Sequence, residues 1–171
     1  MNDTFEIVEK EIGNVAEIAE EIAMWKMPTT IETDLTTLYE YLKAKDQHKE
    51  MGMPYTRYIE VDWEEQMNKN IWQIFVDIFK FKWKLYIGIP TNNAMNASGN
   101  IKTQFIPNQK YLQTTHYGSY QKLGKTYKAI YHYAKEHKII LENSSFEFYQ
   151  NNPKEVKPHE LQTVVMVAIK G

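Results

Sequence analysis

Two stretches of this 171-residue chain repeat one local pattern, and the repeat limits the folds open to it. The segments PYTRY (54–58) and SFEFY (145–149) both read aromatic-x-x-Tyr, and each follows an amphipathic helical segment by a similar interval. Apolar side chains recur with helical spacing in both of those segments, which span about 29–45 and 119–138. The chain is therefore expected to fold as two similar halves.

Strands complete each half. The segment VAEIAEEIAMW (15–25) fits a helical stripe and a strand, and the repeat favours a strand because its counterpart is KYLQTTHY (110–117). The segment IKTQFI (101–106) lies just before that counterpart, across Pro107-Asn108, which predicts a β-hairpin. The expected strands are 5–12, 15–25, 55–62, 83–89, 101–106, 110–117, 145–150 and 160–169.

We therefore predict an α+β fold of duplicated β-β-α-β-β units. The units form an antiparallel sheet with two main helices on one face and a central ligand groove between the halves. The whole chain, 1–171, is expected to be one domain with halves at about 1–90 and 100–171.

Composition excludes several classes of protein. The net charge of −2 and the pI near 6.2 give no basic surface for nucleic acid. There is no cysteine, which excludes disulfides and thiol chemistry. The most apolar stretch, 71–89, contains an aspartate and three lysines and is a poor membrane span, and the acidic N-terminus lacks a signal region. We expect a cytoplasmic protein that binds neither nucleic acid nor membrane.

The stretch SSFEFYQNNP raises the main functional question, because it sets Glu147 among aromatic rings. In a strand, Phe146 and Phe148 share one face, and Glu147 and Tyr149 share the other. The repeat gives Thr56 the place of Glu147 in the first half. The second face is either a solvated strand edge or a pocket in which a carboxylate, costly to bury without a partner, awaits a cation beside aromatic rings. A buried carboxylate of this kind has a raised pKa.

Familiar catalytic and metal-binding motifs are absent from the sequence. His132 and His137 are five residues apart and lack zinc-type spacing, so we expect no metal and no cofactor. His116 fits a local hydrogen bond better than a site. The segment 64–79 predicts a further amphipathic helix, which can serve either as core or as a lid over the groove.

The second half resembles a known family. The segment HYGSYQKLGKTYKAIYHYAKEH (116–137) is similar to the H-x-G-x-Y…L…Y…I segment of GyrI-like small-molecule-binding domains, also described as AraC-type effector-binding domains. The segment SSFEFYQNNP (144–153) resembles their F-E-x-Y-x-x-x-P strand, and PHELQTVVMVAI (158–169) resembles their closing strand. The first half matches only through G-x-P-Y-x-x-Y at 52–58.

The resemblance implies the duplicated fold, a central groove for bulky aromatic or cationic compounds, and a buried glutamate that faces the ligand cation, here Glu147. It also implies that some stand-alone members hydrolyse strained electrophiles and that some bind a topoisomerase. The sequence departs from the family pattern at two positions, so the family's residue roles are not carried over there. Val164 follows Thr163 where the family often has a second glutamate, and Ala168 stands where proline is usual.

From these observations we expect a stand-alone domain that captures an aromatic or cationic small molecule. The alternatives are a small hydrolase in which Glu147 is the catalytic residue, and a protein-interaction module with an acidic face at Glu17, Glu20 and Glu21. The repeat makes Tyr58 the counterpart of Tyr149. The candidate ligand-binding residues come from strand parity, from the repeat and from the family-like motifs. They are Glu147, Tyr149, Tyr120, Tyr58, Trp25 and Trp83.

Overall fold

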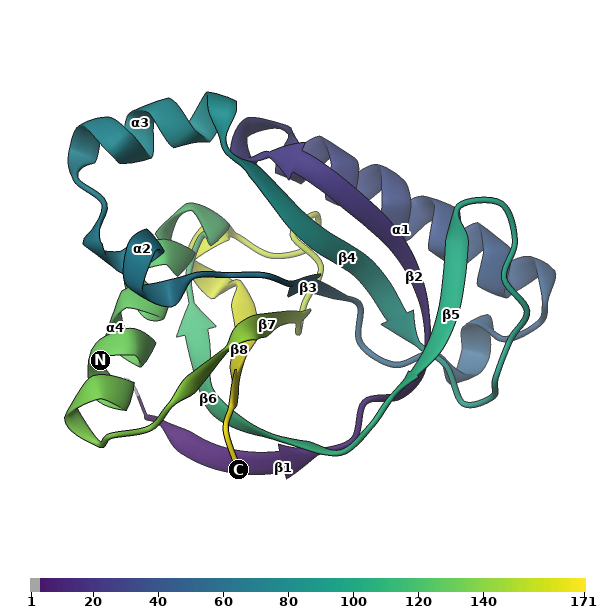
Figure 1. The fold of residues 1–171 in the computed structure, drawn as a ribbon. Helices are drawn as coiled ribbons and strands as arrows, with labels where there is room; N and C mark the ends of the chain where they lie inside the picture. Colours follow the sequence, from purple (N-terminus) through teal and green to yellow (C-terminus); the bar gives the residue numbers. More distant parts are fainter. Residues whose placement is uncertain (1–3) are drawn as a thin grey trace.

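An eight-stranded sheet, antiparallel at every pairing, organises the computed structural model, which describes residues 4–171 (Figure 1). The strands are β1 (Glu6–Lys10), β2 (Gly13–Ala23), β3 (Tyr55–Tyr58), β4 (Lys82–Pro90), β5 (Ile101–Ile106), β6 (Gln109–Tyr117), β7 (Leu141–Tyr149) and β8 (Gln162–Ile169). The α-helices are α1 (Met27–Ala44), α2 (Trp63–Asn68), α3 (Ile71–Lys80) and α4 (Leu123–Glu136). Short 3-10 turns at Met24–Lys26, His48–Glu50, Tyr120–Lys122 and Pro158–Glu160 join some of them.

The order of strands across the sheet confirms the predicted duplication. The order is β1-β6-β8-β7-β3-β4-β2-β5, so β3 and β7 lie at the centre. From the centre outward, the strands follow the same sequence in both halves: β3, β4, β2 and β5 on one side, and β7, β8, β6 and β1 on the other. The outermost strand of each half is therefore supplied by the other half of the chain.

The predicted hairpin is wrong for that reason. Strand β5 pairs with β2, and β6 pairs with β1 and β8. The pairings Lys10 to Gln109 and Gly13 to Ile106 belong to one register, so β1–β2 and β5–β6 form a long two-stranded ribbon. This ribbon connects the two edges of the sheet, so the sheet is strongly curved. The long bend from β6 to β5 shows the curvature (Figure 1).

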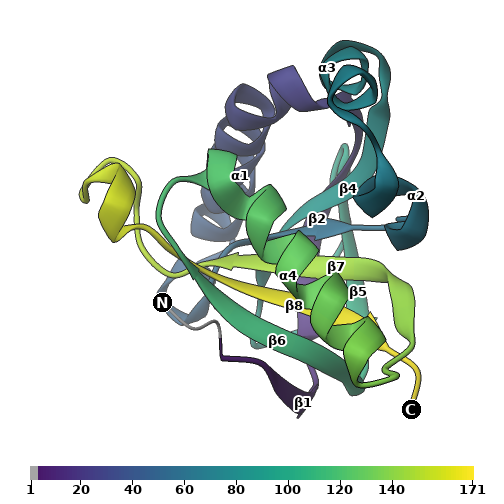
Figure 2. The ribbon, with the colours of Figure 1, turned by 90° about the vertical axis from the view of Figure 1, so that its left-hand side faces the viewer.

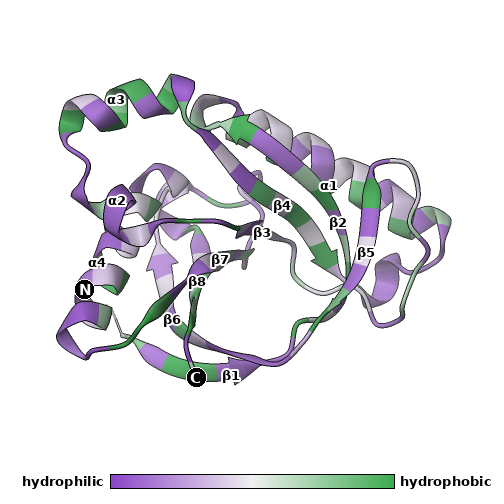
Figure 3. Ribbon diagram, viewed as in Figure 1, coloured by the Kyte–Doolittle hydropathy of each residue, from purple (hydrophilic) through white to green (hydrophobic). Residues whose placement is uncertain are grey.

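The two main helices cover one face of this curled sheet, as predicted. Helix α1 packs on β2 and β4, and α4 packs on β6 (Figure 2). Their buried stripes correspond position by position, because 34, 38 and 42 in α1 have the same spacing as 126, 130 and 134 in α4. Hydrophobic and hydrophilic residues alternate along β4 (Figure 3), as expected for a strand with two different faces.

The face without helices also encloses a core, because the sheet curls around it. Tyr55, Phe146, Phe148 and Met166 are buried there with residues from β2, β5 and β6. Phe146 and Phe148 stack on each other, with ring centroids 5.6 Å apart. The predicted shared face of these two rings is confirmed.

The inserted segment is two helices rather than the single helix predicted over 64–79. The break falls at Lys69, and Asn70 caps α3 in a box with Gln73. The rings of α3 lie outside the core: the side chain of Trp72 is 76% exposed, and Phe75 and Phe79 are also exposed. None of the helices within 4–171 is long and apolar enough to span a bilayer.

Candidate functional site

Thr56 and Glu147 are direct partners where the two halves of the sheet meet. The register of β3 against β7 pairs Thr56 with Glu147, Tyr55 with Phe148 and Arg57 with Phe146. Exchanging each residue for its repeat counterpart reproduces the same pairings. The seam is therefore twofold symmetric in its backbone, and Glu147 lies on the axis at the centre of the sheet.

Glu147 is buried on the helix-covered face, opposite Phe146 and Phe148. Only 4% of its surface is exposed. Tyr127 from α4 donates a hydrogen bond to Oε1 at 2.9 Å, and Tyr149 donates to Oε2 at 3.4 Å. The Tyr149 hydroxyl also hydrogen-bonds Thr56 Oγ1 at 2.7 Å. Within residues 4–171, no lysine, arginine or histidine forms an ion pair with this carboxylate.

Burial dominates the electrostatics of the site. Loss of water raises the pKa of Glu147 to about 7, and the hydrogen bonds from Tyr127 and Tyr149 only partly offset that rise. Burial, followed by the charge of Glu147, raises the pKa of Tyr58, Tyr127 and Tyr149 well above 10. The tyrosines therefore remain hydrogen-bond donors while the carboxyl can take either form near neutral pH.

Most of the predicted aromatic residues gather around Glu147. Tyr120 meets Tyr149 edge to face at 5.5 Å, and Tyr58, whose hydroxyl pKa responds to the charge of Glu147, meets Trp83 at 5.7 Å. Tyr58 and Trp83 both contact the cores under α1 and α4, so they lie between the two halves.

Trp25 lies apart from these rings. It sits in the 3-10 turn after β2, 55% of its surface is exposed, and its ring is faced by Lys26 at 5.1 Å. It belongs to none of the aromatic pairs formed by residues 4–171.

Sequence reasoning missed Tyr127 as a partner of Glu147. Tyr127 lies in the apolar stripe of α4, and its hydroxyl reaches the Glu147 carboxylate on the central strand β7. Trp63 was missed as well. It stacks on Tyr127 with ring centroids 5.4 Å apart and planes inclined by 22°. A tyrosine in an otherwise apolar stripe, facing a strand that carries a carboxylate, is the signal that identifies such a donor.

His116 forms the local hydrogen bonds that its sequence context suggested. Nε2 donates to the Ser119 carbonyl at 3.1 Å, so in the neutral ring Nδ1 accepts from the Thr126 hydroxyl at 2.7 Å. Within residues 4–171, no three histidine or acidic side chains come together as metal ligands.

A second buried glutamate, Glu17, lies on the opposite face of the sheet and is neutralised. Its surface is fully buried, and Arg57 donates to both of its oxygens at 3.1 and 2.8 Å. Tyr55 donates at 2.7 Å, and Gln104 also donates to it. The predicted acidic interaction face is therefore wrong at Glu17, because this side chain is an internal ion pair.

Comparison with known proteins gives the same architecture. The family model for the GyrI-like small molecule binding domain matches residues 17–170. The chain belongs to the GyrI-like small-molecule-binding domain family. No curated protein sequence gives a significant match.

Solved structures share the fold at low sequence identity. The EcmrR C-terminal domain is 16% identical with a TM-score of 0.70, and the match covers 99% of both chains. SAV2435, solved with tetraphenylphosphonium bound, is 12% identical with a TM-score of 0.57, covering 100% of this chain and 95% of that one. A hydrolase from Listeria innocua is 7% identical with a TM-score of 0.58, covering 96% and 92%. At these identities the likeness establishes the fold of this GyrI-like domain and leaves its ligand open.

Proposed function

We propose that this GyrI-like domain captures a bulky lipophilic cation at Glu147, with the carboxylate as counter-charge. The observation that carries the proposal is that Glu147 is 4% exposed and is held by tyrosine hydroxyls instead of a cation. A buried carboxylate without a cationic partner is costly. A ligand cation supplies the missing counter-charge, and its attraction to the carboxylate offsets the free-energy cost of burying that group.

The rings around Glu147 suit a large, flat or multi-ring cation. Tyr58, Tyr120, Tyr149 and Trp83 offer ring faces and edges, each able to add about 0.5–2 kcal/mol of cation–π attraction. The Trp83 Nε1–H is buried and has no hydrogen-bond acceptor within residues 4–171. That donor is therefore free to bind a polar atom of the ligand.

Tetraphenylphosphonium is the probe that tests the proposal, because its charge is permanent and pH-independent. Binding should require ionised Glu147, so affinity should rise by up to about tenfold per pH unit below pH 7 and level off above it. Glu147→Gln should weaken binding and remove the pH dependence. Isothermal titration calorimetry from pH 5.5 to 8.5 measures both effects.

Glu136→Gln is the matched control, because Glu136 is an exposed glutamate at the end of α4. It makes the same chemical change away from the site and should bind as the wild type does. Equal affinity and equal pH dependence in wild type and Glu147→Gln would overturn the role of the carboxylate.

Tyr127→Phe examines the donor that sequence reasoning missed. Removing its hydroxyl takes away a hydrogen bond that favours the ionised carboxylate, so the pKa of Glu147 should rise further. The pH midpoint for tetraphenylphosphonium binding should move upward while the limiting affinity at high pH is largely retained. A midpoint that stays in place would exclude Tyr127 from control of this charge.

Hydrolysis is the second candidate function, and the pKa of about 7 at Glu147 favours it. A carboxyl poised near neutral pH can act as a general base or acid. Turnover of an aryl epoxide, followed by chromatography of the diol, should then be lost in Glu147→Gln, although this variant should still bind the uncharged epoxide. Product formation limited to one equivalent of protein would eliminate this function.

A further inference from the structure

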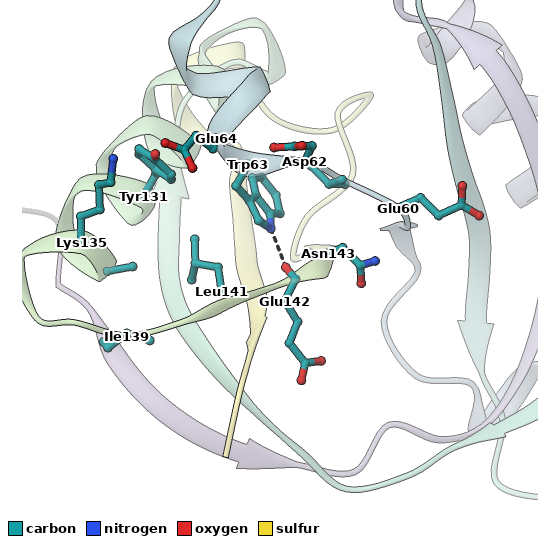
Figure 4. Close-up of a pocket in the computed structure, with 12 residues that line it drawn as sticks. Glu60, Asp62, Trp63, Glu64, Tyr131, Lys135, Ile139, Leu141, Glu142 and Asn143 are labelled. Atoms are coloured by element: carbon teal, nitrogen blue, oxygen red, sulfur yellow. Dashed lines mark hydrogen bonds between the residues drawn. The ribbon is translucent and has the colours of Figure 1, made fainter.

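A hollow of about 530 Å³ opens beside Trp63, at one end of the helix-covered face (Figure 4). Its volume lies in the range of small-molecule sites. We call it the outer hollow. Helix α2, helix α4 and the start of β7 supply most of its walls, together with the loop that follows β3. The lining residues are Glu60, Val61, Asp62, Trp63, Glu64, Tyr131, Ala134, Lys135, Ile139, Leu141, Glu142 and Asn143.

The lining combines an apolar floor with an acidic rim. Trp63, Tyr131 and Leu141 belong to the core cluster under α4. Four carboxylates line the hollow, against a single ammonium group, that of Lys135. Such a lining favours a ligand with an apolar body and a positive charge.

Not all four carboxylates are free to receive that charge. Glu60 forms an ion pair with Lys84 at 2.5 Å, Asp62 caps α2 at the Glu65 amide, and Glu142 accepts from Gln109 at 2.7 Å.

Glu64 is the carboxylate left over. Within residues 4–171, no hydrogen bond or ion pair engages its carboxylate. Figure 4 shows its side chain near that of Tyr131. Only 8% of the surface of Tyr131 is exposed, and its buried hydroxyl forms no close hydrogen bond among the described residues. Glu64 and the Tyr131 hydroxyl therefore lie together at the wall of the hollow. The Tyr131 hydroxyl and, more weakly, the charge of Glu64 raise the pKa of Lys135, so both favour a positive charge at this wall.

Lys135 already places a cation at this wall. Its Nζ lies 5.0 Å from the centroid of the Tyr131 ring, within cation–π range, and its side chain is exposed. An exposed lysine can swing into water at little cost. The ring of Tyr131 is thus available to a ligand cation that displaces it.

Trp63 joins the outer hollow to the Glu147 site. Its indole Nε1–H donates to the Glu142 carbonyl at 2.6 Å, which fixes the ring. The ring stacks on Tyr127, and Tyr127 donates to Glu147. Two stacked rings therefore separate the outer hollow from the buried carboxylate.

We propose that the outer hollow is a second binding site for lipophilic organic cations, with Glu64 as its counter-charge and Trp63 and Tyr131 as its aromatic walls. The proposal takes its class of ligand from the proposed function, but its residues are independent of Glu147. The domain thus has two binding sites for such a cation, one on each side of the Trp63–Tyr127 stack.

The test uses ¹⁹F NMR of protein labelled with 5-fluorotryptophan, titrated with tetraphenylphosphonium in the Glu147→Gln background. The four tryptophans give four resonances, and single replacement by phenylalanine assigns them. The Trp63 resonance should shift and saturate although the inner carboxylate is gone. Trp83, beside the inner site, should respond only at higher concentration.

Substitutions in the Glu147→Gln background, each with a matched control, test which residues bind the cation in the outer hollow. Glu64→Gln should raise the midpoint of the Trp63 shift by about fivefold or more, and Glu136→Gln should leave it in place. Lys135→Met should lower the midpoint because it removes the internal competitor, whereas Lys128→Met, on an exposed position of α4, should not change it.

A Trp63 resonance that stays fixed in Glu147→Gln overturns the second site, and so does a midpoint unaffected by Glu64→Gln. If Glu147→Gln binds as the wild type does at Trp83 while Trp63 titrates as described, the proposed function fails and the outer site stands. The two failures are therefore distinguishable.

Discussion

Thr56 and Glu147 lie opposite each other across the β3–β7 seam, and each occupies in its own half the position that the other occupies in the second half. The backbone is twofold symmetric at this point, but the chemistry is not. One side of the axis carries a hydroxyl and the other a carboxylate, linked through the hydroxyl of Tyr149. The duplicated fold thus places at the centre of the sheet a carboxyl group that has no ion-pair partner among residues 4–171.

Glu147 should make the protein less stable as pH rises. The carboxyl titrates near 4.5 when exposed and near 7 when folded, so between these values the folded protein holds a proton that the unfolded chain has lost. Its contribution to the free energy of unfolding is fully present below pH 4.5 and is lost as pH rises through 7. Urea unfolding of wild type relative to Glu147→Gln should show a loss of roughly 3 kcal/mol over this window.

Asp34 supplies the control for that pH profile. Burial, and then the charge of Glu20, raises the pKa of Asp34 to about 6 from 3.8, so its contribution is lost over a lower pH range. Asp34→Asn should therefore flatten the profile between about pH 4 and 6 and leave the change near pH 7. A wild-type profile parallel to that of Glu147→Gln would contradict the assignment of this charge.

The Glu17–Arg57 pair should be a large contributor to stability when only one partner is removed. Glu17→Gln leaves the Arg57 guanidinium, of which 16% is exposed, without its counter-charge, and should cost about 2–4 kcal/mol in the free energy of unfolding. Glu17→Gln combined with Arg57→Met should cost clearly less than the two single changes added together.

Chemical denaturation of the four proteins in this cycle measures the coupling. Glu21→Gln, at an exposed position of the same strand, is the reference and should be neutral within about 0.5 kcal/mol. Strict additivity of the two single changes would mean that the pair does not act as a unit.

Gly88→Ala should destabilise the protein through crowding. A Cβ at this position in β4 would lie 2.5 Å from Tyr55 Cζ and 2.9 Å from Glu17 Cγ, and these two side chains are fixed by the hydrogen bond between them. We expect a cost of about 1–3 kcal/mol by thermal or chemical denaturation. Gly124→Ala in α4 meets no atom within 4 Å and should instead stabilise by up to about 1 kcal/mol. Equal effects at the two glycines would argue against the close packing of Tyr55 on β4.

The ring of Trp72 should contribute little to folding, in contrast with Trp63. Trp72 is 76% exposed on α3, so Trp72→Gln should change the free energy of unfolding by less than about 0.5 kcal/mol. Trp63→Ala removes a buried ring that stacks on Tyr127, and should cost about 3–5 kcal/mol. A cost above 2 kcal/mol for Trp72→Gln would show that the apolar side of α3 is buried in solution.

Local periodicity was enough to predict the faces of the elements. The two-residue period of a strand placed Phe146 and Phe148 on one side of β7 and Glu147 on the other, as the structure has them. The helical stripes likewise identified the buried sides of α1 and α4. The repeat predicted the duplicated order of elements and the correspondence of Thr56 with Glu147 between the halves, because these depend on patterns within short stretches of chain. That the two residues are direct partners across β3 and β7 came only from the structure.

Tertiary structure decided which segments meet. A two-residue connection at Pro107-Asn108 fits a hairpin locally, but β5 pairs with β2, and β6 pairs with β1 and β8. The neutralisation of Glu17 by Arg57, and the reach of Tyr127 to Glu147, likewise join residues far apart in the chain. Contacts of this kind depend on how whole strands and helices pack, and no periodicity within a single segment carries that information.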